Sequence, residues 1–202
     1  MFKNLSIKAR LIFILSFLSA LLLVIGIIGL NGMSKTEAGL KTVYEDRTVP
    51  LMDLGLIIDM ANRIRTHAVV AASATAPDAA RNANADTLLL DTEIDKLWAK
   101  YMGTTLTPEE KQLAEAFTSQ WKTYQTSRNV TLKHAMEGDL EAATENTLTD
   151  AGPKFAAAHE SLFKLIELQG AVAKQEVEQA QERSANSRNI ALAAIAIGLG
   201  MA

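Results

Sequence analysis

Hydrophobic residues recur at intervals of three and four along much of the chain, which is the spacing of one face of an α-helix. Two series are clearest, one within residues 54–71 and one within residues 155–172. Their members are Leu54, Ile57, Ala61, Ile64, Ala68 and Ala71, and then Phe155, Ala158, Leu162, Leu165, Gln169 and Val172. These series predict two long helices whose apolar faces pack into a core.

Helix-breaking residues are few between positions 34 and 188, and they divide this stretch into four predicted helices. Pro77 ends the first, because proline disfavours helical backbone at the residue before it. Gly103 stops the second, and residues 107–110 (TPEE) start the third as a capping box with proline at the first helical position. Gly138 and Asp139 form a tight connection into the fourth. The expected helices span residues 34–75, 78–102, 108–137 and 139–188.

Connections this short force neighbouring helices to run antiparallel, so the sequence predicts an all-α fold, an up-down-up-down four-helix bundle. Asp78 is the expected N-cap of the second helix. Pro50 and Pro153 fall inside the first and fourth helices. Because proline lacks an N–H and clashes with the preceding turn, each should kink its helix or mark a loosened turn.

Residues 11–30 contain twenty positions without a charge, which is long enough to cross a hydrocarbon core of ~30 Å at ~1.5 Å per residue. Lys3, Lys8 and Arg10 precede this predicted transmembrane helix, whereas Lys35 alone follows closely. The positive-inside rule therefore places residues 1–10 in the cytoplasm and the chain after about residue 31 outside. The alternative is a cleaved signal peptide, whose apolar stretch is usually shorter and ends in a cleavage site of small residues.

The last fourteen residues, 189–202, are again apolar and uncharged, but they are fewer than the ~20 needed to cross a membrane. We expect them to begin a second transmembrane helix that is cut short at Ala202, with an output module in the cytoplasm beyond it. The alternative is a short apolar helix that packs on its own domain. The expected architecture is thus a four-helix bundle of residues 31–188 flanked by two transmembrane helices.

The composition favours helices and excludes several kinds of functional site. Only 4 prolines, 11 glycines and 5% aromatic residues suit long helices better than a sheet. The absence of cysteine excludes disulfides, thiol nucleophiles and thiolate metal sites. A net charge of -3 with interspersed signs argues against nucleic acid as a partner. The sequence also lacks the phosphate-loop, dinucleotide, zinc-protease and serine-hydrolase motifs, so we expect no enzyme activity and no cofactor.

Several N-terminal segments resemble the methyl-accepting chemotaxis receptors that have a four-helix-bundle ligand-binding domain. The likeness covers residues 1 to about 65, and it is carried by NLSIKARL (4–11), the Gly26-x-x-Gly29-Leu30-x-Gly32-Met33 pattern, YEDRTVPL (44–51) and Leu54-Gly55. The resemblance implies a homodimeric receptor in the bacterial inner membrane that binds a small organic acid or amino acid in the periplasm. It further implies that a shift of the fourth helix passes through the second span to a cytoplasmic histidine kinase and its adaptor.

Two alternatives remain open. Sensor histidine kinases and diguanylate cyclases carry similar four-helix sensors, so the kind of output is not determined by the resemblance. A structural membrane bundle that binds no ligand is the other alternative, and it predicts that buried charges are satisfied internally.

A ligand site in such a bundle should lie between helices near the end distal to the membrane. Counting residues from the predicted turns at 76 and 138 places segments of the first, third and fourth helices at one level. The candidate ligand-binding residues are Arg63, Arg65, Tyr124, Arg128, Thr147 and Thr149.

Arg128 is the most informative of these residues, because the three-and-four spacing of the third helix places it on the core side. A buried guanidinium must be paired. Its partner is either an internal carboxylate such as Asp86 or Asp150, or an anionic ligand that the Tyr124 hydroxyl also contacts.

Arg63 and Arg65 flank the apolar series of the first helix and belong either to a ligand site or to a solvated face. The resemblance implies carboxylate binding for Arg63. His67 and His134 lie on different predicted helices without matching ligand spacing, so we expect no metal site. Arg81 is expected to be exposed near the distal end.

Overall fold

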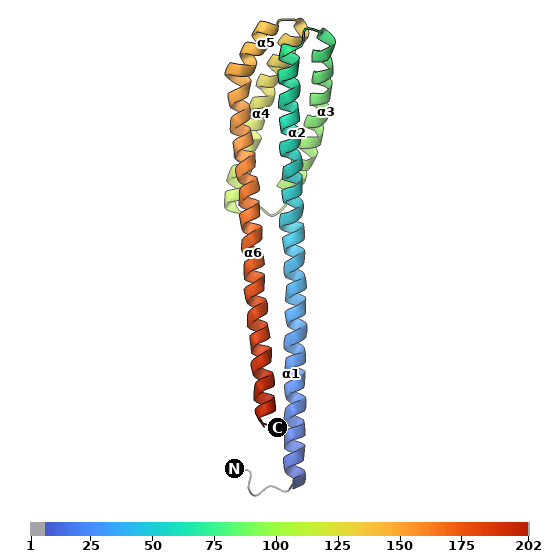
Figure 1. The fold of residues 1–202 in the computed structure, drawn as a ribbon, viewed down its shortest axis with the longest axis vertical. Helices are drawn as coiled ribbons and strands as arrows, with labels where there is room; N and C mark the ends of the chain where they lie inside the picture. Colours follow the sequence, from blue (N-terminus) through green and yellow to red (C-terminus); the bar gives the residue numbers. More distant parts are fainter. Residues whose placement is uncertain (1–6, 202) are drawn as a thin grey trace. The chain divides into compact units, whose positions relative to one another are not determined.

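The computed structural model describes residues 7–201, and every regular element in this range is a helix (Figure 1). The elements are α1 (Ile7–Thr42), η1 (Val43–Thr48), α2 (Val49–Ser73), α3 (Pro77–Met102), α4 (Pro108–Glu137), α5 (Leu140–Asn146), η2 (Thr147–Ala151) and α6 (Gly152–Met201), of which η1 and η2 are π-helical. The predicted all-α fold is confirmed. Residues 1–6 of the predicted cytoplasmic N-terminus, and Ala202, lie outside the described residues.

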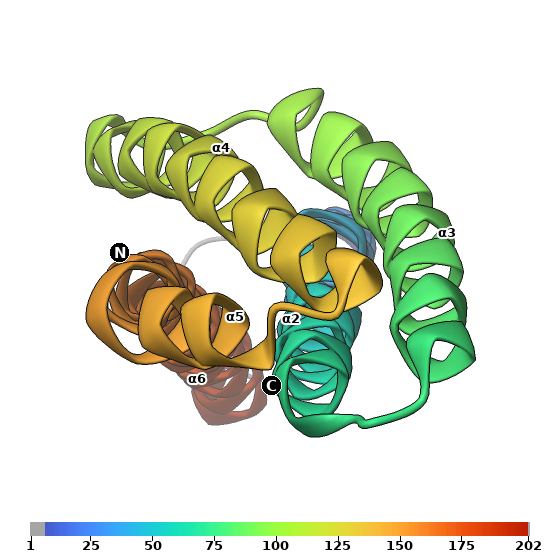
Figure 2. The same ribbon diagram turned by 90° about the horizontal axis from the view of Figure 1, so that it is seen from above.

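The chain divides into two compact units, and the larger, Glu45–Val172, is a four-helix bundle. Its four rods are α2, α3, α4 and the continuous run of α5, η2 and the first part of α6. Only residues 74–76, 103–107 and 138–139 separate these rods, so successive rods run antiparallel. Figure 2 shows them around a common axis, with α3 beside α2 and α4. The predicted bundle is therefore present.

The bundle core consists of the faces that the three-and-four spacing predicts. All six predicted residues of α2 are at most 4% exposed, and Phe155, Ala158, Leu162, Leu165 and Gln169 of α6 are equally buried. The core has two parts. One is rich in large aliphatic and aromatic side chains, and the other, near the distal turns, is mainly alanine: Ala68, Ala71, Ala72, Ala80, Ala83, Leu132, Ala135 and Ala143.

The helix ends follow local chemistry. The predicted capping box is present, because the Glu110 backbone N–H donates to Thr107 Oγ1 and the Thr107 N–H donates to the Glu110 carboxylate. Gly138 ends α4 with a φ of 82°, a left-handed conformation that glycine adopts without strain. The predicted N-cap of α3 is wrong, because α3 begins at Pro77 and Asp78 lies in its first turn, where it pairs with exposed Arg81 at 2.6 Å.

Each internal proline follows a π-helical segment. The segment η1 ends at Thr48, two residues before Pro50, and η2 ends at Ala151, two residues before Pro153. Proline removes one intrahelical donor and its ring crowds the preceding turn, and a wider π turn accommodates both effects. Of the two predicted outcomes, the loosened turn is the one observed.

The second unit comprises the described residues of Met1–Tyr44 and Ala173–Ala202. Within it, α1 and the C-terminal part of α6 lie close together, since Gly198 approaches the Leu21 side chain. In the described part of the chain, one helix, continuous from Ile7 to Ser73, has by length and composition an apolar stretch able to cross a membrane, and none of that stretch is buried. The second predicted span, residues 189–202, stays a prediction.

Candidate ligand site in the four-helix bundle

A cavity of about 340 Å³ lies in the bundle unit, between α2, α4 and the junction of η2 with α6, and it opens to solvent beside the exposed residues Arg65, Val69 and Leu148. Its lining residues are Arg65, Ala68, Val69, Tyr124, Thr131, Thr147, Leu148, Ala151, Gly152, Pro153 and Phe155. This volume falls at the small end of the ~300–1,000 Å³ typical of ligand pockets. Three of the six predicted site residues, Arg65, Tyr124 and Thr147, thus come together at one cavity.

Small side chains account for the space. Ala68, Ala151 and Gly152 stand where the aromatic part of the core meets the alanine part. The π-helical segment before Pro153 contributes Thr147, Leu148 and Ala151 to the wall. Gly152 itself fits this turn closely, because a Cβ added there would lie 2.9 Å from the Thr147 carbonyl oxygen, to which the Gly152 N–H donates.

Tyr124 supplies a buried donor to the cavity wall. It is 2% exposed, and its hydroxyl has no hydrogen-bond partner among the residues that the structure describes. Burial raises the pKa of Tyr124 above its ordinary value, while the positive charges of Arg128 and Arg65 act in the opposite direction. The hydroxyl therefore stays protonated at physiological pH and can donate a hydrogen bond to an acceptor in the cavity.

Arg65 supplies a positive charge at the same wall. Its guanidinium lies over the Phe155 ring, 5.1 Å from the ring centroid, in a cation–π arrangement. Across residues 7–201 no carboxylate forms an ion pair with Arg65. A planar guanidinium with free donors is suited to a carboxylate.

Two threonine hydroxyls line the cavity close to η2, and both are held by neighbours. Thr147 Oγ1 donates to the Ala143 carbonyl at 2.7 Å, and Asn146 Nδ2 donates to Thr131 Oγ1 at 2.8 Å. The two threonine oxygens lie 3.4 Å apart. Because its proton is committed to Ala143, Thr147 offers the cavity an acceptor rather than a donor.

Arg128 is buried on the core side of α4, as predicted, with 1% exposure. Its partner is neither Asp86 nor Asp150, the two carboxylates we expected. Asp91 of α3 accepts from Arg128 Nη1 at 3.1 Å and from Nη2 at 2.8 Å, and Asn129 Oδ1 accepts from Nη2 at 2.9 Å. Arg128 therefore borders the Tyr124 ring, 5.8 Å from its centroid, without lining the cavity.

The two expected partners of Arg128 have other surroundings. Asp86 lies on an exposed position of α3. Asp150 bonds to Lys154 Nζ at 2.7 Å and to the Ser127 hydroxyl at 2.5 Å, and these bonds, the one to Lys154 foremost, hold the pKa of Asp150 below its ordinary value.

Arg63 and Thr149 do not line the cavity. Both are exposed, and the Thr149 hydroxyl donates to the Glu145 carbonyl of its own helix at 2.8 Å.

The cavity residues that sequence reasoning did not propose for a site are mainly apolar, such as Val69, Leu148 and Phe155. Phe155 was predicted only as a core residue, and no signal separates a cavity wall from a filled core in the spacing alone.

A continuous series of aromatic contacts joins the cavity to both tryptophans of the chain. Tyr124 contacts Phe155 and Trp121, with centroid distances of 5.1 and 5.2 Å. Trp121 contacts Phe117, and Phe117 contacts Trp98 at 4.6 Å. Trp121 is therefore one contact away from a cavity residue, and its fluorescence should respond to an occupant.

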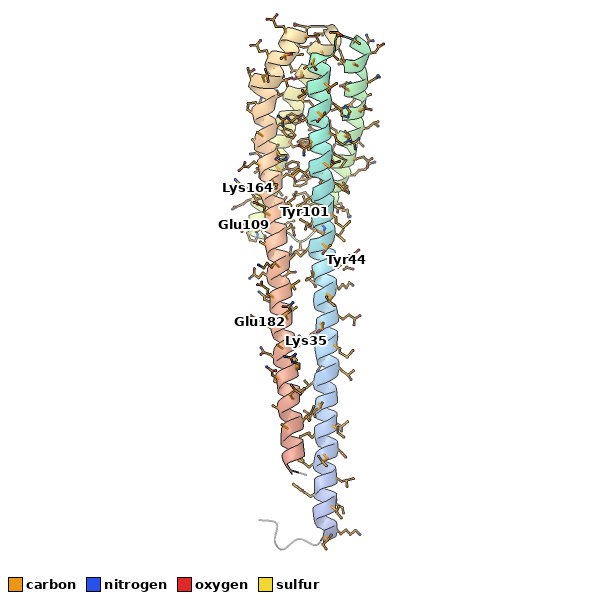
Figure 3. All side chains as sticks on the ribbon, viewed as in Figure 1. Lys35, Tyr44, Tyr101, Glu109, Lys164 and Glu182 are labelled. Carbon is orange, nitrogen blue, oxygen red and sulfur yellow. The ribbon has the colours of Figure 1, made fainter. Side chains whose placement is uncertain are left out.

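Polar side chains also lie at the opposite end of the bundle, where α3 ends and α4 begins (Figure 3). Arg47 of η1 donates to Glu110 at 3.3 Å, and Lys100 pairs with Asp53 of α2 at 2.7 Å. Tyr101, which Figure 3 labels, accepts a hydrogen bond from Gln169 of α6 at 3.3 Å. These contacts join η1 to α4, α3 to α2, and α3 to α6, and none of these residues lines the cavity.

Comparison with known families indicates the kind of domain that contains this cavity. The family described as the four helix bundle sensory module for signal transduction matches residues 4–184. No curated protein matches the chain. The matched range includes all of the bundle and every residue of the cavity. This module is a signalling domain rather than a catalytic one. The chain belongs to the family of four-helix-bundle sensory modules of methyl-accepting chemotaxis proteins.

Proposed function

We propose that this chain is the ligand-binding sensor of a transmembrane chemoreceptor, and that the cavity between α2, α4 and η2 binds its ligand, a small organic anion or amino acid. One observation carries the proposal. An unpartnered buried hydroxyl, Tyr124, and a guanidinium without a carboxylate, Arg65, line the same cavity of a sensory module. An unpaired buried hydroxyl is costly, and a bound anion would accept from Tyr124 and pair with the exposed guanidinium of Arg65.

The proposed receptor lies in the bacterial inner membrane as a homodimer, with the bundle in the periplasm. The apolar and unburied stretch of α1 supports a membrane anchor, and the basic residues before it support a cytoplasmic N-terminus. Residues 189–202 would begin the second span. A histidine kinase and its adaptor in the cytoplasm are the proposed partners of the output.

Signal transmission is proposed to use α6, which begins at the cavity and continues to Met201. A ligand that binds better when η2 and α6 hold one axial position would bias the equilibrium toward that position by the difference in affinity. A small shift of α6 would then carry the signal towards the second span.

A structural bundle without a ligand is the second candidate, and one observation favours it. Arg128, the buried charge that this alternative requires to be satisfied internally, pairs with Asp91 inside the bundle. The pair accounts for Arg128 but leaves the buried Tyr124 hydroxyl without a partner among the described residues, so we favour the sensor.

Blocking the cavity from its rim tests the proposed function. Val69 lines the cavity and is 44% exposed, whereas its neighbour Val70 is 52% exposed and does not line it. The full chain in lipid nanodiscs would be screened by thermal shift against organic acids and amino acids. A ligand should raise the melting temperature of the unmodified chain and of Val70→Trp, and should have no effect on Val69→Trp.

Two results would count against this function. No stabilising ligand in either class, with the chain folded, would favour the structural bundle. A ligand that stabilises Val69→Trp and Val70→Trp equally would place binding outside the cavity. Tryptophan fluorescence in the same titrations reports whether the occupant reaches the neighbourhood of Trp121.

A further inference from the structure

The cavity wall combines one positive charge, one buried donor and two threonine hydroxyls with mainly apolar side chains. Arg65 and Tyr124 both contact Phe155, and together they are called the donor end. Apolar atoms of Ala68, Val69, Leu148, Ala151, Pro153 and Phe155 make up most of the remaining wall. An inorganic anion would satisfy the donors but leave the apolar wall without a partner. The cavity therefore favours an occupant that has both an anionic end and an apolar body.

The lining also contains no acidic side chain, and this distinguishes two classes of small carboxylate. Two carboxylates of neighbouring elements are already paired, Asp91 with Arg128 and Asp150 with Lys154 and Ser127. An amino acid would bring an ammonium group next to its carboxylate, beside the positive charge of Arg65. That ammonium would meet a like charge without gaining a counter-charge from the lining.

From these two features we propose that the cavity binds a monocarboxylic acid with a small apolar body, such as one ring or one short branched chain, and rejects the amino acid of the same side chain. The carboxylate accepts from Arg65 and from the Tyr124 hydroxyl, and the body packs on Phe155 and the small residues of η2 and α6. This inference rests on the proposed function and narrows its ligand class.

Matched pairs of compounds test the proposed ligand class. The full chain in nanodiscs would be titrated with 3-phenylpropionate against phenylalanine, and with 4-methylpentanoate against leucine, with calorimetry and tryptophan fluorescence as readouts. Each pair shares its carboxylate and its apolar body and differs in the ammonium. We expect at least one of the acids to bind, and its amino acid to bind about tenfold more weakly or worse, as expected for a charge placed beside Arg65 without a counter-charge.

Two substitutions test the donor end. Arg65→Gln should weaken binding of the acid by about tenfold or more, because a charge-assisted hydrogen bond is lost. Tyr124→Phe should weaken it by roughly five- to tenfold while leaving the melting temperature of the free chain unchanged, because the hydroxyl has no partner to lose. Arg63→Gln is the matched control, since Arg63 is exposed on the same helix and does not line the cavity.

The possible outcomes distinguish a failure of the proposed ligand class from a failure of the proposed function. An amino acid that binds as tightly as its matched acid, or inorganic phosphate that competes equally with the acid, overturns the ligand class and leaves a ligand-binding sensor. Equal losses for Arg63→Gln and Arg65→Gln overturn the assignment of the donor end. A folded chain that binds neither acids, amino acids nor phosphate overturns both the class and the proposed function.

Discussion

Arg128 on α4 and Asp91 on α3 form a bidentate ion pair inside the bundle, with nitrogen–oxygen distances of 3.1 and 2.8 Å. The Arg128 side chain is 1% exposed and the Asp91 side chain 13%. Removal of one partner from a buried pair leaves the other as an uncompensated charge, which costs more than the pair itself contributes. We therefore predict that Asp91→Ala lowers the free energy of unfolding by about 3 kcal/mol in chemical denaturation.

Asp86→Ala is the control for this prediction, because Asp86 is an exposed aspartate on the same helix and its loss should change stability by less than about 0.5 kcal/mol. The double variant Asp91→Leu with Arg128→Met should recover most of the stability, since apolar groups of similar volume can replace a buried pair. Similar losses for Asp91→Ala and Asp86→Ala would contradict a buried pair.

The sequence contains enough information to predict Asp91 as the partner of Arg128. In the second helix, Ala80, Ala83, Thr87, Asp91 and Ile94 recur at three and four, and all five are buried. This spacing places Asp91 on the core face and Asp86 outside it. The same reasoning, applied to the other helices, correctly predicted the buried faces of α2, α4 and α6, because burial in a bundle follows the period of the helix.

The cavity, in contrast, could not be predicted from the sequence. Periodicity predicts which face of a helix is buried, but not how closely two faces approach, and the space beside Ala68 and Gly152 depends on that approach. The π-helical segment η2 adds a second obstacle, because an α-helical count of residues fails across a wider turn. Of the two threonines predicted for the site, Thr147 lines the cavity while Thr149 is exposed, because residues two apart lie on different faces of a helix.

Gly152 tests whether the π-helical turn is needed for stability. A Cβ at Gly152 would lie 2.9 Å from the Thr147 carbonyl oxygen, a distance that forces the backbone to move. We predict that Gly152→Ala lowers the melting temperature. Gly170→Ala is the matched control on the same helix, because a Cβ there meets nothing within 4 Å.

In an exposed helical position, replacement of glycine by alanine should stabilise by roughly 0.5–1 kcal/mol, so the two variants should shift the melting temperature in opposite directions. A stabilising Gly152→Ala would mean that η2 converts to an α-helix at no cost. Circular dichroism followed during heating supplies the measurement.

Pro153 tests the link between the cavity and signalling. It lines the cavity and follows η2, and its missing N–H favours the wide turn. Replacement by alanine restores the donor and should shift η2 towards an α-helical register, which changes the axial position available to α6. We predict that Pro153→Ala alters kinase control in a reconstituted receptor more than it alters ligand affinity. Equal loss of binding and signalling would show that Pro153 acts only as part of the cavity wall.

Tyrosine titration tests the two buried hydroxyls together. Burial raises the pKa of Tyr101 to about 12, with a smaller contribution in the same direction from Glu110, and burial raises the pKa of Tyr124 as well. For a group whose folded pKa lies above its unfolded value, the contribution to stability is complete below the unfolded pKa, here 10.0. It is lost as the pH rises through the folded pKa.

The measurement needs a background of Tyr44→Phe, because the chain has 3 tyrosines and the other two are Tyr101 and Tyr124. At pH 10 the folded chain should show almost no tyrosinate absorbance, whereas the chain unfolded in guanidinium should be about half ionised. Between pH 10 and about 12 the folded chain should lose stability as the unfolded state releases its tyrosine protons. Half ionisation at pH 10 with full helical circular dichroism would mean that both hydroxyls are solvated, and the cavity would then lose its buried donor.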